Sequence, residues 1–444
     1  MKDLTVGNEY KSLFYFSLPI LIGNLFQQFY NVADSIIVGR ILGKENLAAV
    51  GFCFQINLIL VALSMGLTLG TSILISRHFG AKEEQEIGPV IDTGFSFSIV
   101  VSACISILGI LFCGGIIQLF RVPEDTAGFA YTYLRIIFIG AVPSFLYNTI
   151  TNILRGLGDS KSPVYFLIGA ALLNIVLDIL FVKYCNMGIA GAAYATIIAQ
   201  LTSFVGSFIY MRVRYATYRI HILHPNFRFS ILKDSLRIGI PSMTQQVFKS
   251  IGFMVLQGIV NGFGSTCMAA YAATSKIDSF AQLPALNLGQ ALSNFVAQNL
   301  GAKKEVRAKK GFKAALLMGW AITITISLIV VPFPDLLVRL FTNDPAVLEI
   351  GRTYLRIVGV FYCVDATMQM LNGILLGYEK PFVPMISTVV SLCLMQVPAA
   401  LILSATSLGY IGIWIATPFG WIGGVLIRLY YYRKTVGKKQ PQKD

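Results

Sequence analysis

The sequence predicts an all-α polytopic membrane protein with twelve transmembrane helices in two six-helix lobes. Of its 444 residues, 55% are apolar and 13% are charged, whereas soluble domains carry about 25% charged residues. Apolar windows of about 20 residues, enough to cross a hydrocarbon core of roughly 30 Å, recur along the whole chain. The second half of the sequence also repeats motifs of the first half at a constant spacing, which indicates two copies of one unit.

The apolar windows give the order of the spans. Their even number places both ends of the chain on the same side of the membrane. We expect spans near residues 14–39, 47–76, 92–118, 129–154, 163–184, 188–211, 238–260, 267–298, 314–341, 350–376, 382–405 and 409–432.

The basic residues give the orientation of these spans. Of the 35 Lys and Arg residues, 25 fall on the side of the termini and five on the opposite side. This asymmetry is the positive-inside bias, so we expect both termini to be cytoplasmic. Anionic lipid headgroups account for the formal charge of +14 better than a nucleic-acid partner does.

The N-terminus and the cysteines carry no sign of processing or cross-linking. The first span is expected to remain uncleaved, because the residues before it mix acids with lysines and lack a small-residue cleavage site. The seven cysteines have no C-x-x-C spacing and lie in or beside apolar segments. We therefore expect buried free thiols rather than disulfides or metal ligands.

The internal repeat defines the domains. The motif FGAK at 79–82 recurs as LGAK at 300–303, and TYLRI at 132–136 recurs at 353–357, both at a spacing of 221 residues. Six spans per copy give the two lobes the same orientation. Two such lobes are typical of transporters, which hold substrate between the lobes near the midplane.

The domain boundaries follow from the repeat. The expected division is an N-terminal lobe at 1–211, a cytoplasmic linker at 212–237, a C-terminal lobe at 238–432 and a basic tail at 433–444. Within the linker, residues 229–236 have the pattern of a short amphipathic helix on the cytoplasmic surface.

Polar residues inside the N-terminal lobe suggest an ion site. Asp34, Asp178 and Thr196 come from three spans, at depths of roughly 8–12 Å from the outer face at 1.5 Å per residue, and Asn174 lies one turn deeper than Asp178. Two carboxylates in one partly buried site raise the affinity for a proton or a small cation. Asp, Asn and Thr oxygens suit H⁺ or Na⁺. The alternative is that each Asp caps a broken helix or reaches the outer surface.

The C-terminal lobe differs from the N-terminal lobe at these positions. Residues 221 beyond the two acids are Val255 and Ala399, so the acidic pair is not repeated. Instead, Lys249 and Asp365 lie near the midplane at equal depth, which suggests an ion pair. That pair would serve either packing or transport.

Span 8 adds further polar groups, and other motifs are excluded. Lys276 and Asp278 are followed by amides at four-residue spacing, which face either a central cavity or neighbouring helices: Gln290, Asn294 and Gln298. His221 and His224 lack companions at metal-ligand spacing. The chain has no nucleotide-binding motif and no catalytic constellation, so we expect neither an ATP-driven pump nor an enzyme.

Several stretches resemble the MATE (multidrug and toxic compound extrusion) family of bacterial type. They are LPILIGNLFQQFYNVADSIIVGRILG in span 1, LAAVGF and SRHFGAK in span 2, and SKIDSFAQLPALNLGQALSNFVAQNLGAK in span 8. The resemblance covers essentially the whole chain. It implies two lobes forming a V in the bacterial inner membrane. It further implies export of organic, often cationic, compounds by antiport with H⁺ or Na⁺.

The resemblance also implies roles for single residues. Asp34, Asn174, Asp178 and Thr196 match the family's cation site in the N-terminal lobe, and Tyr30 matches a tyrosine linked to it. Pro19 matches the proline at which the first helix is proposed to bend. Asp365 matches an acid used by some branches, whereas Lys249 replaces an acid there, which favours coupling in the N-terminal lobe alone. The expected substrate-cavity residues are Gln27, Asn31, Asn148, Asn152, Lys249, Gln290, Asn294 and Asp365.

The predicted function is secondary-active multidrug efflux by alternating access. An ion entering from outside would bind at Asp34 and Asp178, bend span 1 at Pro19 and release the drug. We expect no cofactor beyond the coupling ion, small organic substrates, a lipid bilayer around a monomer, and no nucleic acid. The rivals are a flippase or exporter of lipid-linked or other metabolites on the same architecture, and a passive channel or receptor-like membrane scaffold.

Overall fold

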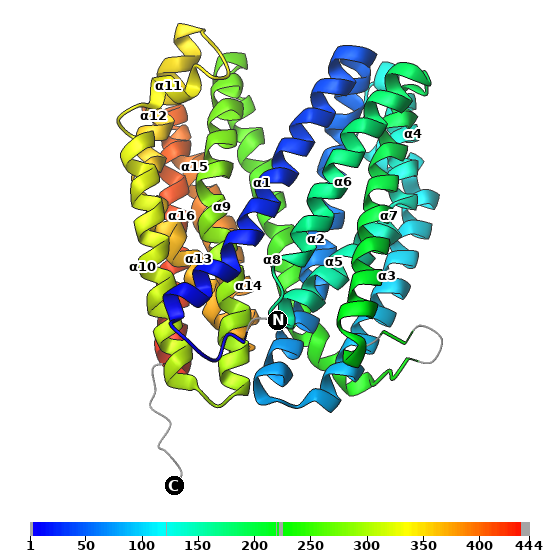
Figure 1. Cartoon of the computed structure of the whole chain (residues 1–444). Helices are drawn as coiled ribbons and strands as arrows, with labels where there is room; N and C mark the ends of the chain where they lie inside the picture. Colours follow the sequence, from blue (N-terminus) through cyan, green and yellow to red (C-terminus); the bar gives the residue numbers. More distant parts are fainter. Residues whose placement is uncertain (1–2, 121, 219, 222–224, 437–444) are drawn as a thin grey trace. The chain divides into compact units, whose positions relative to one another are not determined.

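The protein is described by a computed structural model over residues 3–120, 122–218, 220–221 and 225–436. Within those ranges, the side chains of Asn31, Val32, Ser35, Lys44 and Leu47 are not described. All regular elements in the described part of the chain are helices, and in each half the long helices run side by side (Figure 1).

The first half contains α1 (Glu9–Leu42), α2 (Lys44–Ala81), α3 (Glu84–Leu119), α4 (Glu124–Ile139), α5 (Ala141–Gly156), α6 (Ser162–Asp178), η1 (Ile179–Tyr184) and α7 (Gly188–Arg214), followed by η2 (Ala216–Tyr218). The second half contains α8 (Phe229–Asn261), α9 (Ser265–Gly301), α10 (Glu305–Val330), α11 (Pro334–Val338), α12 (Pro345–Gly359), α13 (Tyr362–Gly377), α14 (Phe382–Val389), η3 (Val390–Gln396), α15 (Val397–Ser404) and α16 (Tyr410–Thr435).

These elements form twelve rods of membrane-spanning length. Seven segments are long and apolar enough to cross a bilayer, and two bent pairs, α4 with α5 and α12 with α13, bring the number to nine in the described chain. The remaining long helices are α1, α8 and α9, of 34, 33 and 37 residues. These three carry most of the polar stripes found in the sequence, which lowers their hydropathy. The all-helical membrane fold is therefore confirmed.

The fourth rod of each half shows the internal repeat directly. It bends by 45° between α4 and α5 and by 49° between α12 and α13. The breaks lie at Gly140 and at 360–361, which are 220 to 221 residues apart. A bend conserved at equivalent places in both halves is expected if one six-rod unit was duplicated.

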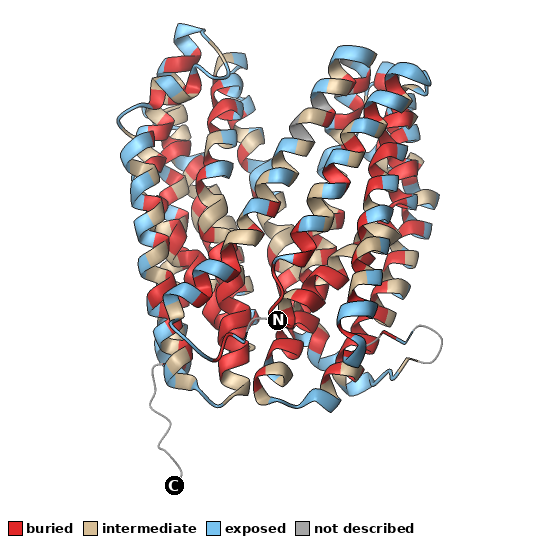
Figure 2. Ribbon diagram, viewed as in Figure 1, coloured by how far each residue is buried: buried red, intermediate tan, exposed pale blue. Residues whose placement is uncertain are grey.

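The outer surface of the helices is apolar. Leu111, Leu119 and Val213 are among many large hydrophobic side chains that are more than two-thirds exposed. Figure 2 shows buried residues on the faces that the helices turn toward neighbours of the same half. Exposed apolar belts of this extent fit contact with lipid tails.

The chain divides into two compact units that do not coincide with its two halves. Unit 1 comprises Met1–Asp3 and Leu18–Met243, and unit 2 comprises Leu4–Ser17 and Thr244–Asp444. The first turns of α1 thus belong to unit 2, and the first turns of α8 belong to unit 1. The division falls beside Pro19 in α1 and beside Pro241 in α8, and both helices continue through these prolines.

The start of α8 packs closely on α2 in unit 1. A Cβ atom placed on Gly70 would lie 2.1 Å from the carbonyl oxygen of Ser235, and one on Gly66 would lie 2.4 Å from the Cα atom of Met243. The Ser235 hydroxyl is 3.1 Å from the Thr71 hydroxyl. Small residues allow this approach, as in other membrane helix pairs.

The predicted surface helix at 229–236 is therefore not a separate element. It is helical and amphipathic as expected, but it forms the first turns of α8, because its buried Ser235 face packs on α2. The segment before it is docked by Asp92 of α3. That carboxylate accepts hydrogen bonds from the His221 amide at 2.9 Å, the His221 ring at 3.0 Å and the Asn226 amide at 3.1 Å. His224 lies outside the described residues.

The start of α1 is held in unit 2 by contacts that we call the N-terminal clamp: residues 4–9 against Gln298, Asn299, Lys304 and Arg307. Leu4 is fully buried, and its amide donates to Gln298 Oε1 at 3.1 Å. Its carbonyl accepts from Asn299 Nδ2 at 3.1 Å, and the Thr5 carbonyl accepts from Lys304 Nζ at 2.9 Å. Arg307 donates to the carbonyls of Gly7 at 2.6 Å and Val6 at 2.9 Å, and to Glu9 Oε1 at 3.1 Å.

The loop between α5 and α6 is organised by one carboxylate. Asp159 accepts hydrogen bonds from the amides of Lys161 and Ser162, and from the hydroxyls of Ser162, Tyr210 and Tyr215. Burial raises the pKa of Asp159, but the hydrogen bonds from Ser162 and Tyr215 outweigh it, so its pKa lies below the usual range.

The cysteines are free thiols throughout the described chain, but the expected burial holds only in part. Cys53, Cys113 and Cys267 are buried, whereas Cys104 and Cys185 are exposed. The expectation was wrong for these two, because Cys104 lies on an exposed face of α3 and Cys185 follows the end of η1.

Candidate functional site

The two acids of the first lobe meet inside unit 1. Asp34 of α1 is 7% exposed and Asp178, the last residue of α6, is fully buried. Their carboxyl groups lie within hydrogen-bonding reach of each other. Two carboxyl groups this close share a proton or a cation, because a buried pair of bare carboxylates repels.

Asn174 and Thr196 complete the arrangement. With its amide oriented to satisfy both neighbours, Asn174 donates to Asp178 Oδ2 at 2.8 Å and accepts from the Thr196 amide at 3.2 Å. Tyr30, one turn before Asp34 on α1, has its hydroxyl within hydrogen-bonding reach of Thr196. The structure thus brings together all five residues for which a cation-site role was expected.

The acid pair has unused acceptors. Asp34 Oδ1 and Asp178 Oδ1 are both buried and have no hydrogen-bond partner in the described chain. A buried carboxylate oxygen without a donor is costly, so these two oxygens are suited to accept a proton or to bind a cation. The π-helical turn η1 starts directly after Asp178, and such turns are frequent at functional sites.

The other candidates of unit 1, which were expected to line a substrate cavity, are spread over α1 and α5. Asn152 is buried and donates to Thr68 Oγ1 at 2.6 Å, so its amide joins α5 to α2. Asn148 and Gln27 are half-buried. The side chain of Asn31 lies outside the part of the chain that the structure describes.

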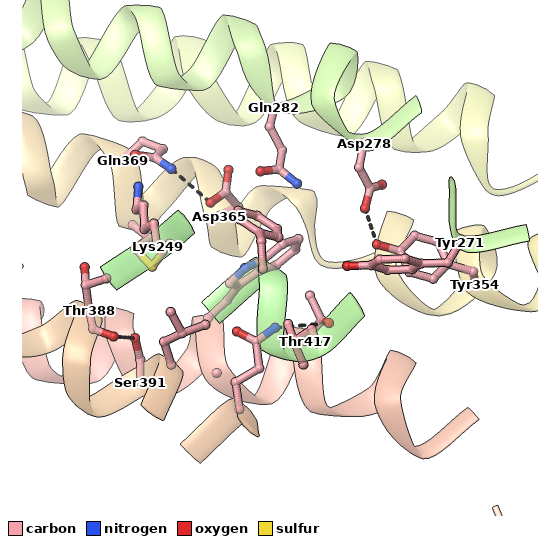
Figure 3. A pocket seen from close by; sticks show the side chains of 17 residues that line it. Lys249, Tyr271, Asp278, Gln282, Tyr354, Asp365, Gln369, Thr388, Ser391 and Thr417 are labelled. Carbon is pink, nitrogen blue, oxygen red and sulfur yellow. Dashed lines mark hydrogen bonds between the residues drawn. The ribbon is translucent and has the colours of Figure 1, made fainter. Parts of the chain in front are cut away.

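Unit 2 contains a cavity of about 120 Å³. Lys249 and Asp365 line it, together with aromatic and amide side chains from α8, α9, α12, α13, η3 and α16. In Figure 3, Lys249, Asp365 and Gln369 lie toward one end of this cavity, and Asp278 with Tyr271 and Tyr354 lies toward the other.

The expected ion pair between Lys249 and Asp365 is not formed at contact distance. Within the described residues, no carboxylate oxygen lies within 4.0 Å of the Lys249 ammonium, and the two groups interact only at longer range. Asp365 accepts instead from Gln369 Nε2 at 3.1 Å. Both side chains line one cavity, as their equal depth along two spans suggested. Depth alone does not determine the distance between the ammonium and the carboxylate.

Sequence reasoning gave no role to Asp278 and missed Arg428. Asp278 is buried, and its two carboxylate oxygens accept from the hydroxyls of Tyr354 and Tyr362. Arg428 is 1% exposed and donates to Thr388 Oγ1 at 2.8 Å, while its Nε has no partner. Its position near the end of the last span made it look like part of the basic cytoplasmic end.

The amide stripe of span 8 has mixed surroundings. Gln298 is buried and accepts from the Leu4 amide, so it is part of the N-terminal clamp. Asn294 is buried at 3% exposure and Gln290 is half-buried. The stripe was expected to face either a central cavity or neighbouring helices. Gln298 contacts the neighbouring segment at Leu4.

Known proteins resemble this chain over nearly its full length. The MatE family profile matches twice, at residues 19–180 and 241–402. The two matches start 222 residues apart, so they pair Pro19 with Pro241 and place Leu256 at the position of Asp34. An apolar residue stands there at either spacing, 221 or 222.

The relatives are transporters. A probable multidrug resistance protein of Bacillus subtilis, YpnP, is 30% identical over 97% of this chain and 96% of its own. A FAD transporter of Shewanella oneidensis is 26% identical over 86% of each chain. A solved outward-facing conformation of a multidrug resistance MATE family transporter has a TM-score of 0.92 at 26% identity and covers 98% of each chain. The chain thus belongs to the MATE family of multidrug efflux transporters, which work by alternating access and are not enzymes.

Proposed function

We propose that this protein exports small organic compounds in exchange for inward H⁺ or Na⁺, and that Asp34 and Asp178 form the coupling site. The observation that carries the proposal is the pair of buried carboxyl groups within reach of each other, each with one unpaired oxygen. A proton shared by the pair removes the repulsion, and a Na⁺ bound by the free oxygens and the Asn174 amide does the same.

Pro19 supplies the hinge in this proposal. Proline removes one backbone hydrogen bond of α1, and the division between the two units falls between Ser17 and Leu18. Ion binding at Asp34 acts on the segment of α1 beyond this weak point. Bending there would displace Gln27 and Asn31 of α1. The substrate-binding residues that we propose are Gln27, Asn31, Asn148 and Asn152 in unit 1, and Lys249, Gln290, Asn294 and Asp365 in unit 2.

The proposed setting is the bacterial inner membrane, with both termini cytoplasmic and the protein acting as a monomer. The excess of basic residues on the side of the termini supports this orientation. The proposed lobes are 1–211 and 238–432, with 212–237 as linker and 433–444 as tail.

The test is transport in proteoliposomes under separately imposed pH and Na⁺ gradients. Wild-type protein should drive uphill ethidium export with one of the two gradients, and Asp34→Asn should abolish it while leaving expression and folding intact. Asp234→Asn, an exposed acid at the start of α8, is the matched control and should transport normally. Gradient-driven export by Asp34→Asn at the wild-type rate would remove Asp34 from the mechanism. Downhill movement alone would indicate a channel.

Export of a metabolite is the second candidate, since one relative is named a FAD transporter. Competition distinguishes the two. An excess of flavin nucleotide should leave ethidium export unchanged if organic cations are the cargo, and should inhibit it if a nucleotide takes the same path.

A further inference from the structure

The cavity of unit 2 has a charge balance that differs from that of the acid pair in unit 1. Among the described residues, four side chains of charged type lie in or beside it: Lys249 and Arg428 are basic, and Asp278 and Asp365 are acidic. The acids have donors within hydrogen-bonding distance. Both oxygens of Asp278 accept from tyrosine hydroxyls, and Asp365 accepts from Gln369.

The basic groups are less well satisfied. Lys249 lines the cavity and has three N–H donors, yet no hydrogen bond or close ion pair to it is found in the described chain. The Arg428 guanidinium donates to Thr388 Oγ1 at 2.8 Å and to the Pro384 carbonyl at 3.4 Å, and its buried Nε has no partner. Thr388 itself lines the cavity, so the positive end of Arg428 lies directly behind the wall.

The free donors of Lys249, with the Arg428 guanidinium behind the wall, favour an anion as the ligand. A cation would have to displace the tyrosine hydroxyls to reach Asp278, and at Asp365 it would meet the positive charge of Lys249 at the same end of the cavity. A carboxylate would meet the unpaired ammonium of Lys249 directly and would offset the cost of a charge held inside the membrane. The side-chain amide of Gln282 also lines the cavity and can donate to the carboxylate, and Gln396 uses one of its two amide N–H groups on Thr417 Oγ1 and has the other left.

The rest of the lining is aromatic and sized for one ring. Phe253, Tyr271, Tyr354 and Trp421 contribute to it (Figure 3 labels the two tyrosines). The volume of about 120 Å³ is close to the roughly 150 Å³ of an engineered apolar cavity that binds benzene. The cavity therefore fits one aromatic ring with a small charged substituent.

We propose that this cavity binds aromatic carboxylates, with the carboxylate on the Lys249 ammonium and the ring among the aromatic side chains. The inference deepens the proposed function, because it gives unit 2 a ligand class of opposite charge to organic cations. Its test measures binding and does not depend on transport.

The test uses three probes of one shape and different charge: para-fluorobenzoate, para-fluorobenzamide and para-fluorobenzamidine, titrated into the full-length protein in neutral detergent and followed by fluorine NMR. Wild type should bind the benzoate at least tenfold more tightly than the benzamide, and the benzamidine most weakly. Lys249→Gln should remove the preference for the benzoate, and Lys249→Arg should retain most of it. Lys276→Gln, at an exposed lysine of α9 outside the cavity lining, is the matched control and should bind as wild type does.

Two results would overturn the proposal: equal affinity of wild type for the three probes, or tightest binding of the benzamidine. Both use the unmodified protein, so they stand even if a Lys249 variant fails to fold. Asp34→Asn should bind the benzoate normally. Loss of transport with intact benzoate binding would therefore concern the coupling site alone, and absence of benzoate preference with intact transport would concern this cavity alone.

Discussion

Removing the Arg307 side chain should weaken the N-terminal clamp without unfolding unit 2. Arg307→Ala deletes hydrogen bonds to the Gly7 carbonyl at 2.6 Å, the Val6 carbonyl at 2.9 Å and Glu9 at 3.1 Å. It also deletes two longer contacts to the Leu4 carbonyl, at 3.3 and 3.4 Å. The bonds from Gln298, Asn299 and Lys304 to the same segment remain, so we expect a weakened clamp rather than a lost one.

The magnitude follows from the two short bonds to backbone carbonyls. A hydrogen bond that involves a charged group contributes about 1.5–3 kcal/mol, and the Arg307 side chain is only 15% exposed. Taking the lower value for each bond gives a loss of about 3 kcal/mol in docking free energy. At 1.4 kcal/mol per factor of ten, the ratio of docked to released segment falls roughly 150-fold.

Hydrogen–deuterium exchange read by mass spectrometry measures this ratio. Exchange of the Leu4 amide, which is held by Gln298, should accelerate by about two orders of magnitude in Arg307→Ala, whereas amides in the middle of α10 should not change. Lys309→Ala is the control on the same helix, because Lys309 forms only an exposed pair with Glu305 at 2.8 Å, for which about 0.3–0.5 kcal/mol is typical. Unchanged exchange at Leu4 in Arg307→Ala, or equal acceleration in both variants, would refute the reasoning.

Three further predictions concern packing, pH and topology. Gly70→Ala should lower the free energy of unfolding by about 1–3 kcal/mol through overpacking, because its Cβ would lie 2.1 Å from the Ser235 carbonyl; Gly88→Ala, which meets no atom within 4 Å, should leave thermal stability in detergent unchanged. Asp159→Asn should lower the melting temperature at neutral pH. The pKa of Asp159 is lower in the folded state than in the unfolded state. The stabilisation by its carboxylate is therefore present above the unfolded-state pKa near 3.9 and is lost as the pH falls through the folded-state pKa. The melting temperatures of wild type and variant should converge below about pH 4, and a constant difference between them would contradict this. A variant with Cys185 as its single cysteine should react with a membrane-impermeant maleimide added outside intact cells, and labelling only after permeabilisation would reverse the proposed orientation.

The helical framework could be predicted from the sequence, because the length and hydropathy of the apolar windows identify the spans. The spans over α1, α8 and α9 were expected as well, although polar residues lower the hydropathy of these three helices. The start of α8 could not be recognised as part of a long helix from the pattern at 229–236 alone. That pattern is amphipathic either way, and only its packing on Gly66 and Gly70 distinguishes a surface helix from a packed one.

Some residues of the candidate sites could be predicted from the sequence and others could not. Asp34, Asn174 and Asp178 could be grouped from depth and helical spacing, since carboxylates are rare in spans and these fall at one level. Arg428 could not, because a basic residue near a span end looks like a cytoplasmic anchor. The contact distance between Lys249 and Asp365 also depends on rotamers and neighbouring amides, which spacing along two helices does not encode.

The exchange of first turns between the units bears on how such a chain could have arisen. In a six-rod ancestor, a first helix that began on a neighbouring copy would have made the fold complete only as a domain-swapped dimer. Fusion of two copies would then convert the contacts between two chains into contacts within one chain. The same exchange of first turns affects how the present protein behaves when its two halves are produced as separate fragments. A cut within 212–228 yields a first fragment that carries the clamp segment of unit 2, and a second fragment that carries the α8 turns of unit 1. We therefore expect neither fragment to be stable when produced alone, and co-production to restore both.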